Sequence, residues 1–342
     1  MLDDLKYINQ VDKSDALGVA GKQPIQLTHD YNVVVKATNT IQNIVVGGMG
    51  GSAWPALMLR SWPTVTVPFE VSSNYDIPSY VNENTLYIAS SYSGNTEETI
   101  SALHQAEEKG AQVVVMSAGG KLSELAKEAG HPFFEIPGGI QPRMSSFYFL
   151  AALVQILEPL SLVRAGSLAE LHEAATWLEG KNNTWLAEVK LAENPAKQLA
   201  EKIEGKTVIV YSGPLLFSAA NMWKICINES AKNLAWANQF PEFSHNEFIG
   251  WSSHPVEKPF AVIDIASNLE HPRIQKRFEL TDKLLSGKRP HAITVKPEGE
   301  TVLQQILWCF SLGGYVSVYL AVLNNVDPTP VDLVERFKAE LG

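Results

Sequence analysis

The stretch LYIASSYSGNTEET at positions 86–99 constrains the fold more than any other part of the chain. It begins as a short apolar strand, passes through a loop of hydroxyl and glycine residues at 90–96, and continues with helical spacing. A helix start presents about four unpaired backbone N–H groups and about half a positive charge. Together with several hydroxyls, these groups form a cradle for an anion, usually phosphate. The alternative is that Asn95 or Thr96 only caps the helix, although a cap needs one hydroxyl and this loop has several.

A second strand–loop–helix unit precedes this one. The motif GGMGGS at 47–52 follows a β-branched strand, turns on its glycines and ends in Ser52, which opens a helix. The motif fits the dinucleotide fingerprint poorly, because Ala53 stands at the third glycine position. An acidic residue, Glu70, does lie at about the expected distance, so this motif alone leaves a dinucleotide site open.

Strands and helices alternate over 41–136, and a second alternating block follows at 201–342. This pattern predicts an α/β fold with parallel sheets flanked by helices, whose ligand loops lie at the carboxyl ends of the strands. We expect an N-terminal domain with a helical arm at 1–158, a helical connection at 159–200 and a C-terminal domain at 201–342. The predicted strands lie at 44–46, 65–71, 86–89, 111–117, 131–136, 206–211, 259–265 and 291–299.

Bulk composition excludes several classes of function. The net charge is −10 and no Lys/Arg block occurs, which argues against general binding to nucleic acid or to an anionic membrane. Cys226 and Cys309 lie in apolar helical sequence and are expected to be reduced core residues of a cytoplasmic protein. The polar, acidic N-terminus does not resemble a signal peptide. The apolar runs at 147–157 and 306–323 are expected to be buried helices, and no Cys/His motif suggests a metal.

Arg143 is the first of three candidate catalytic residues. It lies in GGIQPRMSSF, after a strand and before an apolar helix, and is the only charged residue between Glu135 and Glu158. A guanidinium at this place could neutralise a phosphate or a developing oxyanion. The alternative is an ordinary surface or capping arginine.

Glu229 and His245 are the other two candidates. Glu229 lies between MWKICI and AKNLAW, which we take as one largely apolar helix, and such a glutamate is a candidate general base. The alternative is a solvated glutamate that pairs with Lys232 one helical turn later. His245 follows in FSHNEF, close to Glu247, and histidine is the usual proton-transfer group near neutral pH.

Five motifs occur in the order GGMGGS, SSYSGNTEET, QPR, INESAK and EFSHNEFIGW. In this order they resemble the archaeal and bacterial bifunctional phosphoglucose/phosphomannose isomerases, which belong to the sugar isomerase (SIS) domain group. The resemblance covers the chain from about residue 40 to 342. It implies two SIS domains per chain and a homodimer with active sites near the subunit interface. Aldose–ketose isomerisation needs no redox cofactor, and we expect neither a cofactor nor a metal.

The resemblance also implies substrate contacts in the N-terminal half. Carried over position by position, the serine loop would hold the sugar phosphate and the glycine-rich turn would line the sugar. The residues concerned are Ser91, Ser93 and Thr96 for phosphate, and Gly50, Gly51 and Ser52 for the sugar.

The remaining roles implied by the resemblance concern proton transfer and specificity. Arg143 would steady the enediolate, and Glu229 would move a proton between C1 and C2. His245, supplied by the partner subunit, would help to open the sugar ring. Lys338 would reach the sugar, and Thr329 is the counterpart of a threonine associated with accepting mannose 6-phosphate.

The sequence therefore favours an isomerase that interconverts glucose 6-phosphate and mannose 6-phosphate with fructose 6-phosphate through a cis-enediol. The alternative from another class is a non-catalytic SIS-domain sensor of sugar phosphates, which would not need Glu229 and His245 together. An aminosugar synthase would normally add an amidotransferase domain, for which we expect no room. A nucleotide-dependent oxidoreductase is disfavoured by the polar loop at 90–96.

Overall fold

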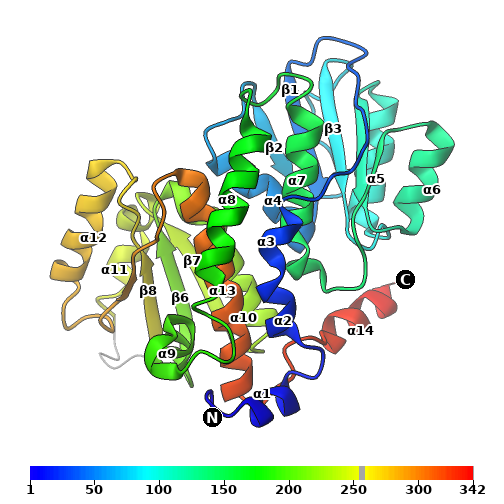
Figure 1. Ribbon diagram of the computed structural model, residues 1–342. Helices are drawn as coiled ribbons and strands as arrows, with labels where there is room; N and C mark the ends of the chain where they lie inside the picture. Colours follow the sequence, from blue (N-terminus) through cyan, green and yellow to red (C-terminus); the bar gives the residue numbers. More distant parts are fainter. Residues whose placement is uncertain (254–258, 342) are drawn as a thin grey trace. The chain divides into compact units, whose positions relative to one another are not determined.

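Two parallel sheets, one in each half of the chain, form the framework of the protein (Figure 1). A computed structural model describes residues 1–253 and 259–341. The N-terminal unit comprises Lys22–Trp177, and the C-terminal unit comprises Met1–Gly21 and Leu178–Gly342. The prediction of an α/β fold with two sheets flanked by helices is confirmed.

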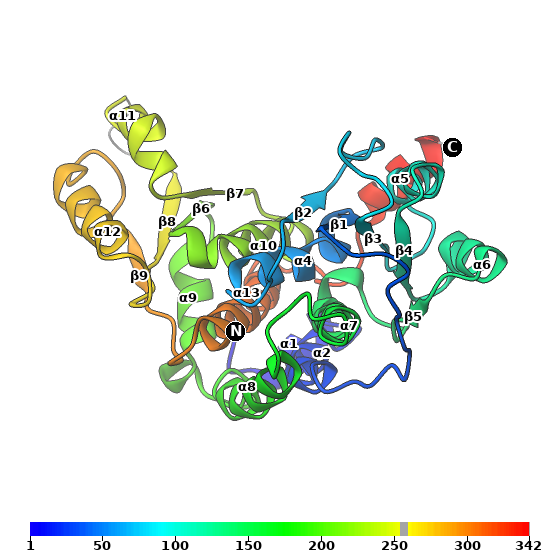
Figure 2. The same cartoon turned by 90° about the horizontal axis from the view of Figure 1, so that it is seen from above.

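The sheet of the N-terminal unit has five parallel strands in the order β2-β1-β3-β4-β5. Helices α5 and α6 lie against one side of this sheet (Figure 2). Alternate side chains such as Val45, Tyr87 and Val115 pack against these two helices, while their neighbours along each strand face the other side of the sheet. The strands are β1 (Asn43–Gly48), β2 (Phe69–Ser72), β3 (Thr85–Ser90), β4 (Gln112–Ser117) and β5 (Phe133–Glu135). The helices are α3 (Gln23–Gln26), η1 (Gly50–Ser52), α4 (Trp54–Ser61), α5 (Glu97–Glu108), α6 (Gly120–Ala129), η2 (Pro142–Met144) and α7 (Ser146–Leu157).

The sheet of the C-terminal unit has four parallel strands in the order β7-β6-β8-β9. An aromatic cluster that includes Tyr211, Phe240, Phe243 and Phe278 covers one of its faces. The strands are β6 (Thr207–Ser212), β7 (Ala235–Gln239), β8 (Phe260–Ile265) and β9 (Ile293–Val295). The helices are α1 (Leu5–Val11), α2 (Ala16–Gly21), η3 (Leu191–Glu193), α9 (Pro195–Ile203), η4 (Pro214–Leu216), α10 (Phe217–Glu229), η5 (Glu242–His245), α11 (Glu247–Gly250), α12 (Pro272–Leu284), α13 (Val302–Leu323) and α14 (Asp332–Leu341). The chain passes from one unit to the other within α8 (Ser167–Asn182).

The N-terminal arm, Met1–Gly21, belongs to the C-terminal unit. The boundaries of the two units therefore differ from those expected at 158 and 200. Tyr7 donates a hydrogen bond to the carbonyl oxygen of Val322 on α13, at 3.4 Å. Lys197 on α9 is fully buried and lies 3.4 Å from the carboxylate of Asp3. The first residues of the chain therefore complete the helical layer around α9 and α13.

Helix α13 is the core of the C-terminal unit. It is long and apolar enough to cross a membrane, but 94% of its most apolar window is buried inside the protein. The expected buried helices at 147–157 and 306–323 are therefore observed as α7 and α13. Cys226 and Cys309 are both buried, and neither forms a disulfide within the described residues. Burial raises the pKa of the Cys309 thiol well above its usual range.

Two local predictions are wrong. The run AKNLAW does not continue a helix, because α10 ends at Glu229 and Ala235–Gln239 pairs with β6 as strand β7. The strand expected at 65–71 is shorter and later, at Phe69–Ser72. Residues ahead of it are engaged elsewhere, since Val65 forms an isolated antiparallel bridge with Val163.

Candidate active site

The serine loop, residues 91–96, joins the carboxyl end of β3 to α5 in the N-terminal unit. Its hydroxyls are fixed by bonds within the loop. Ser91 Oγ lies 2.7 Å from Thr96 Oγ1 and accepts a hydrogen bond from the Gly94 N–H at 3.2 Å. Ser93 Oγ accepts from the Asn95 N–H at 3.2 Å. The loop is thus a pre-organised set of hydroxyl and N–H groups at a helix start.

The start of α5 has no side-chain cap. Thr96 occupies the N-cap position, but its hydroxyl bonds to Ser91 instead of to the first turn of the helix. The Asn95 side chain accepts a hydrogen bond from the Lys121 N–H at 2.9 Å. The alternative that one of these residues merely caps the helix is therefore wrong. The first-turn N–H groups and the positive end of the helix dipole are left for another acceptor.

The glycine-rich turn after β1 packs directly against the serine loop. Ser52 Oγ accepts a hydrogen bond from the Tyr92 N–H at 2.9 Å, and Ser90 Oγ donates to the Ser52 carbonyl oxygen at 2.8 Å. A Cβ at Gly48 would lie 2.7 Å from the Ser90 carbonyl oxygen, so only glycine permits this approach. Gly50 adopts a φ of 49°, in the left-handed region that glycine tolerates best.

Arg143 lies on η2, which follows β5, and only 3% of its surface is exposed. A Cβ at Gly51 would lie 3.1 Å from the Arg143 backbone nitrogen, so η2 adjoins the glycine-rich turn. The guanidinium donates to Gln141 Oε1 at 3.3 Å. Its burial contradicts the alternative of a surface arginine. Three loops at the carboxyl edge of one sheet therefore bring together a hydroxyl cradle and a buried cation.

Glu229 is the last residue of α10 in the C-terminal unit and is half-buried. Because the helix ends there, the helical i,i+3 geometry proposed for Lys232 is absent. Lys232 adopts a φ of 51° and donates to the carbonyl oxygen of Asp327 at 2.6 Å. That bond and the bond from Asn324 Nδ2 to the Ala231 carbonyl oxygen, at 3.0 Å, hold the end of α10 beside the segment that leads to Thr329.

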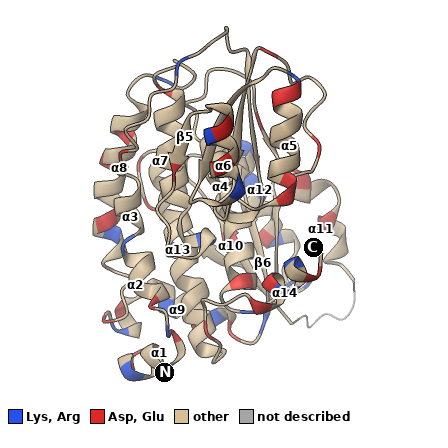
Figure 3. Cartoon of the chain, turned by 90° about the vertical axis from the view of Figure 1, so that its right-hand side faces the viewer, with Lys and Arg blue, Asp and Glu red and all other residues tan. Residues whose placement is uncertain are grey.

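The remaining predicted residues of this unit differ in exposure. His245 ends the short helix η5 and is exposed, whereas Thr329 is half-buried in the segment that follows α13. Lys338 lies on α14, exposed, with its ammonium 2.8 Å from Glu335 on the same helix. Helix α14 carries charges of both signs (Figure 3).

The predicted site residues thus form two groups. The structure brings Gly50, Gly51, Ser52, Ser91, Ser93, Thr96 and Arg143 together in the N-terminal unit. Glu229, His245, Thr329 and Lys338 belong to the C-terminal unit. The roles assigned to all of these residues stay predictions.

Tyr92 is a residue that sequence reasoning missed. Its N–H bonds to Ser52, and its hydroxyl accepts from the Ile140 N–H at 3.2 Å. It therefore links all three loops of the N-terminal group. The signal available in the sequence was its position, as the one aromatic residue inside the hydroxyl-rich loop.

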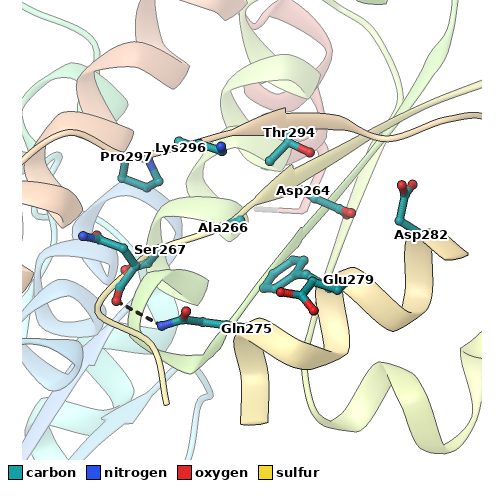
Figure 4. A pocket seen from close by; sticks show the side chains of 11 residues that line it. Asp264, Ala266, Ser267, Gln275, Glu279, Asp282, Thr294, Lys296 and Pro297 are labelled. Carbon is teal, nitrogen blue, oxygen red and sulfur yellow. Dashed lines mark hydrogen bonds between the residues drawn. The ribbon is translucent and has the colours of Figure 1, made fainter. Parts of the chain in front are cut away.

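A cavity of about 650 Å³ lies in the C-terminal unit between α12 and the carboxyl ends of β8 and β9 (Figure 4). Carboxylates of Asp264, Glu279 and Asp282 line it, against one ammonium group, that of Lys296. This balance does not suit a phosphate, and no predicted site residue lines the cavity. Within residues 1–253 and 259–341, no group of three or more His, Cys, Asp or Glu side chains is arranged to hold a metal ion.

Comparison with known proteins identifies the family. Residues 192–341 match the bacterial phospho-glucose isomerase C-terminal SIS domain, and residues 40–157 match the SIS domain. The bifunctional phosphoglucose/phosphomannose isomerase of Aquifex aeolicus is 33% identical over 91% of this chain and 94% of its own length. The protein of the same name from Caldicellulosiruptor bescii is 34% identical over 93% and 94%.

The chain belongs to the bifunctional phosphoglucose/phosphomannose isomerase family. A crystal structure of a glucose-6-phosphate isomerase-like protein from Thermus thermophilus shares this family member's fold, with a TM-score of 0.68, 18% identity and coverage of 99% of this chain and 98% of that one. A relative with a different name, the D-glucosamine-6-phosphate 4-epimerase of Sulfolobus acidocaldarius, is 30% identical over 89% of this chain and 90% of its own length.

Proposed function

We propose that this protein interconverts glucose 6-phosphate and mannose 6-phosphate with fructose 6-phosphate. The observation that carries the proposal is the uncapped start of α5 beneath a set of fixed hydroxyls, next to the buried Arg143. The names of the bifunctional relatives support the choice of hexose phosphates. A remote phosphate anchor supplies binding energy that holds the reacting carbons in place.

The reaction moves one carbon-bound proton. Glu229 removes the proton from C2 of the open-chain aldose and returns it to C1, while the hydroxyl proton on O2 is transferred to O1. The negative charge of the enediolate develops on these oxygens, where the guanidinium of Arg143 stabilises it. Glucose and mannose 6-phosphates differ only at C2 and give the same intermediate, so one base serves both substrates. Thr329 and Lys338 are proposed sugar contacts.

Ring opening precedes this transfer, because both sugars are cyclic in solution. His245 is the proposed acid and base for this step. Its exposed position on the C-terminal unit supports a role in the site of a partner subunit, and we extend the proposal to a homodimer in the cytoplasm.

Mixed subunits test the dimer. A Glu229→Gln chain and a His245→Ala chain are each expected to be inactive, but a mixed dimer would hold one intact site if His245 acts across the interface. Random exchange should then restore about a quarter of the wild-type activity. No recovery, despite exchange confirmed by mass spectrometry of two tagged chains, would place His245 in the site of its own subunit.

The main test is the Glu229→Gln variant. We expect isomerisation to fall by at least about 10³-fold while binding of glucose 6-phosphate, measured by calorimetry, changes less than about threefold. Both hexose phosphates should be assayed side by side, together with glucosamine 6-phosphate. Binding without turnover in the wild type would favour a sensor. Turnover of glucosamine 6-phosphate alone would favour a 4-epimerase.

A further inference from the structure

A row of polar side chains crosses the sheet of the C-terminal unit. Asn238 on β7, Tyr211 on β6 and Asp264 on β8 are register partners in neighbouring parallel strands, so their side chains lie on the same face. Tyr211 is fully buried and Asp264 is 3% exposed. Polar groups at such positions destabilise a sheet unless each finds a partner.

Two members of this row hold one carboxylate. Glu247, at the start of α11, accepts a hydrogen bond from the Tyr211 hydroxyl through Oε1. Its Oε2 accepts from Asn238 Nδ2 at 2.6 Å. Because the two donors are neighbours across β6 and β7, they fix both oxygens and hence the plane of the carboxylate. We refer to Tyr211 and Asn238 together as the Glu247 clamp.

Contacts with Trp251 and Arg289 fix the Tyr211 side chain. Trp251 Nε1 donates to the Tyr211 oxygen at 3.1 Å, which leaves the tyrosine proton to point at Glu247. The guanidinium of Arg289 lies 5.9 Å from the centre of the Tyr211 ring and pairs with Asp264 at 3.1 Å. Burial, followed by the bond to Glu247, raises the pKa of the Tyr211 hydroxyl, so it remains a donor.

The Glu247 clamp stabilises the segment formed by η5 and α11, residues 242–250. His245 ends η5 and Glu247 begins α11, and both helices are only four residues long, too short to be stable alone. Asn246 between them accepts from the Glu247 N–H and donates to Glu242 Oε1, both at 2.6 Å. The His245 backbone is thus tied to Glu247, while its imidazole stays exposed.

We infer that Tyr211 and Asn238 are positioning residues for His245, because they fix Glu247 and with it the turn that presents the imidazole. This inference rests on the proposed ring-opening role of His245. Catalytic groups must be held within about 0.5 Å of the productive geometry, and an exposed side chain on a short turn needs an outside anchor to meet that limit.

The test measures ring opening separately from isomerisation. In a Glu229→Gln background, exchange between the α and β anomers of glucose 6-phosphate is followed by two-dimensional NMR. Adding Tyr211→Phe should slow this exchange at least about tenfold, towards the rate seen with His245→Ala. Tyr315→Phe is the matched control, because within the described residues its buried hydroxyl has no hydrogen-bond partner. It should leave the exchange unchanged.

Two further measurements decide between outcomes. If Tyr211→Phe does not fold, Asn238→Ala removes the second donor at a half-buried edge position and should slow the exchange severalfold. A lower melting temperature with unchanged exchange per folded molecule would overturn the inference and leave a structural role only. A wild-type chain that neither isomerises nor accelerates anomer exchange would instead overturn the proposed function.

Discussion

The carboxyl ends of the two sheets use the same backbone plan with different side chains. In the N-terminal unit, residues 91–96 connect β3 to α5, and in the C-terminal unit residues 266–271 connect β8 to α12, a loop of equal length. The turns after β1 and β6 also correspond, since η1 and η4 each begin two residues after their strand ends. Each pair of loops adjoins the point where the strand order reverses, which is where such sheets take ligands.

The chemistry of the corresponding loops differs at each position proposed for phosphate. By position along the loop, Ser91, Ser93 and Thr96 correspond to Ala266, Asn268 and His271. The start of α12 is capped by the His271 side chain, which accepts from the Arg273 N–H at 3.1 Å, whereas α5 has no side-chain cap. Helix α5 therefore leaves its first turn for a ligand, and α12 does not.

In the C-terminal unit a carboxyl side chain fills the corresponding space. Glu270 is 5% exposed, and its Oε1 accepts from the Leu215 N–H at 2.9 Å, in the turn after β6. A Cβ at Gly213 would lie 2.1 Å from that carboxylate oxygen. The carboxylate thus occupies the space between the two loops. A shared fold does not imply a shared site, because the side chains decide whether the space between the loops is open.

The largest expected effect, on substrate binding, comes from replacing serines of the serine loop with the residues at the corresponding positions of the 266–271 loop. Ser91→Ala combined with Ser93→Asn should raise KM for hexose 6-phosphates ~100-fold or more, since each hydrogen bond to a charged group contributes about 1.5–3 kcal/mol. Steady-state kinetics with glucose 6-phosphate checks this. Ser123→Ala on α6 is the control, because that hydroxyl donates to the Gly120 carbonyl oxygen of its own helix, at 2.8 Å, and no phosphate role is proposed for it. An unchanged KM would remove the loop from the phosphate site.

Sequence patterns predicted the strands that are apolar in themselves. Val113–Val115, for example, is buried on both faces of a parallel sheet and reads as a continuous apolar run. Strand β7 was missed because AWANQ has no such run. It lies at the sheet edge with Trp236 51% exposed, and its pairing with β6 defines it more than its own residues do.

Local motifs also predicted the serine loop, but not the contacts that cross the fold. In the Glu247 clamp, Tyr211 binds a glutamate that lies 36 residues later in the sequence. Its other member, Asn238, comes to lie beside Tyr211 only through the pairing of β6 with β7. The same limit applies to the N-terminal arm. Ile8 and Leu17 are plainly apolar, but the sequence does not say which of two cores buries them.

A smaller effect is expected from a matched pair of glycine substitutions. Gly48→Ala meets the Ser90 backbone oxygen at 2.7 Å, which cannot move without breaking the loop, and should lower the unfolding free energy by about 2–3 kcal/mol. Gly213→Ala meets the end of a side chain, Glu270, which can swing away at the loss of its bond to Leu215, so about 1 kcal/mol is expected. Urea unfolding compares the two variants. The double variant Gly213→Ala/Glu270→Ala should lose much less unfolding free energy than the sum of the losses in the two single variants. Additive losses would show that Glu270 does not fill the space beside Gly213.

The smallest expected effect is the pH dependence of the built-in carboxylate. Burial raises the pKa of Glu270 above its usual value of 4.5, partly offset by its backbone hydrogen bonds. An acid whose pKa is raised by folding contributes stability that is fully present below the unfolded pKa and is lost as the pH rises through the folded one. Glutamine keeps the acceptor for the Leu215 N–H but does not ionise. The stability of Glu270→Gln relative to wild type should therefore increase between about pH 4 and about pH 7, as measured by urea midpoints. Glu300→Gln, an exposed substitution just before α13, should show no such trend. A relative stability that falls over this range would mean that the folded protein prefers the ionised carboxylate, because its backbone hydrogen bonds outweigh the cost of burial.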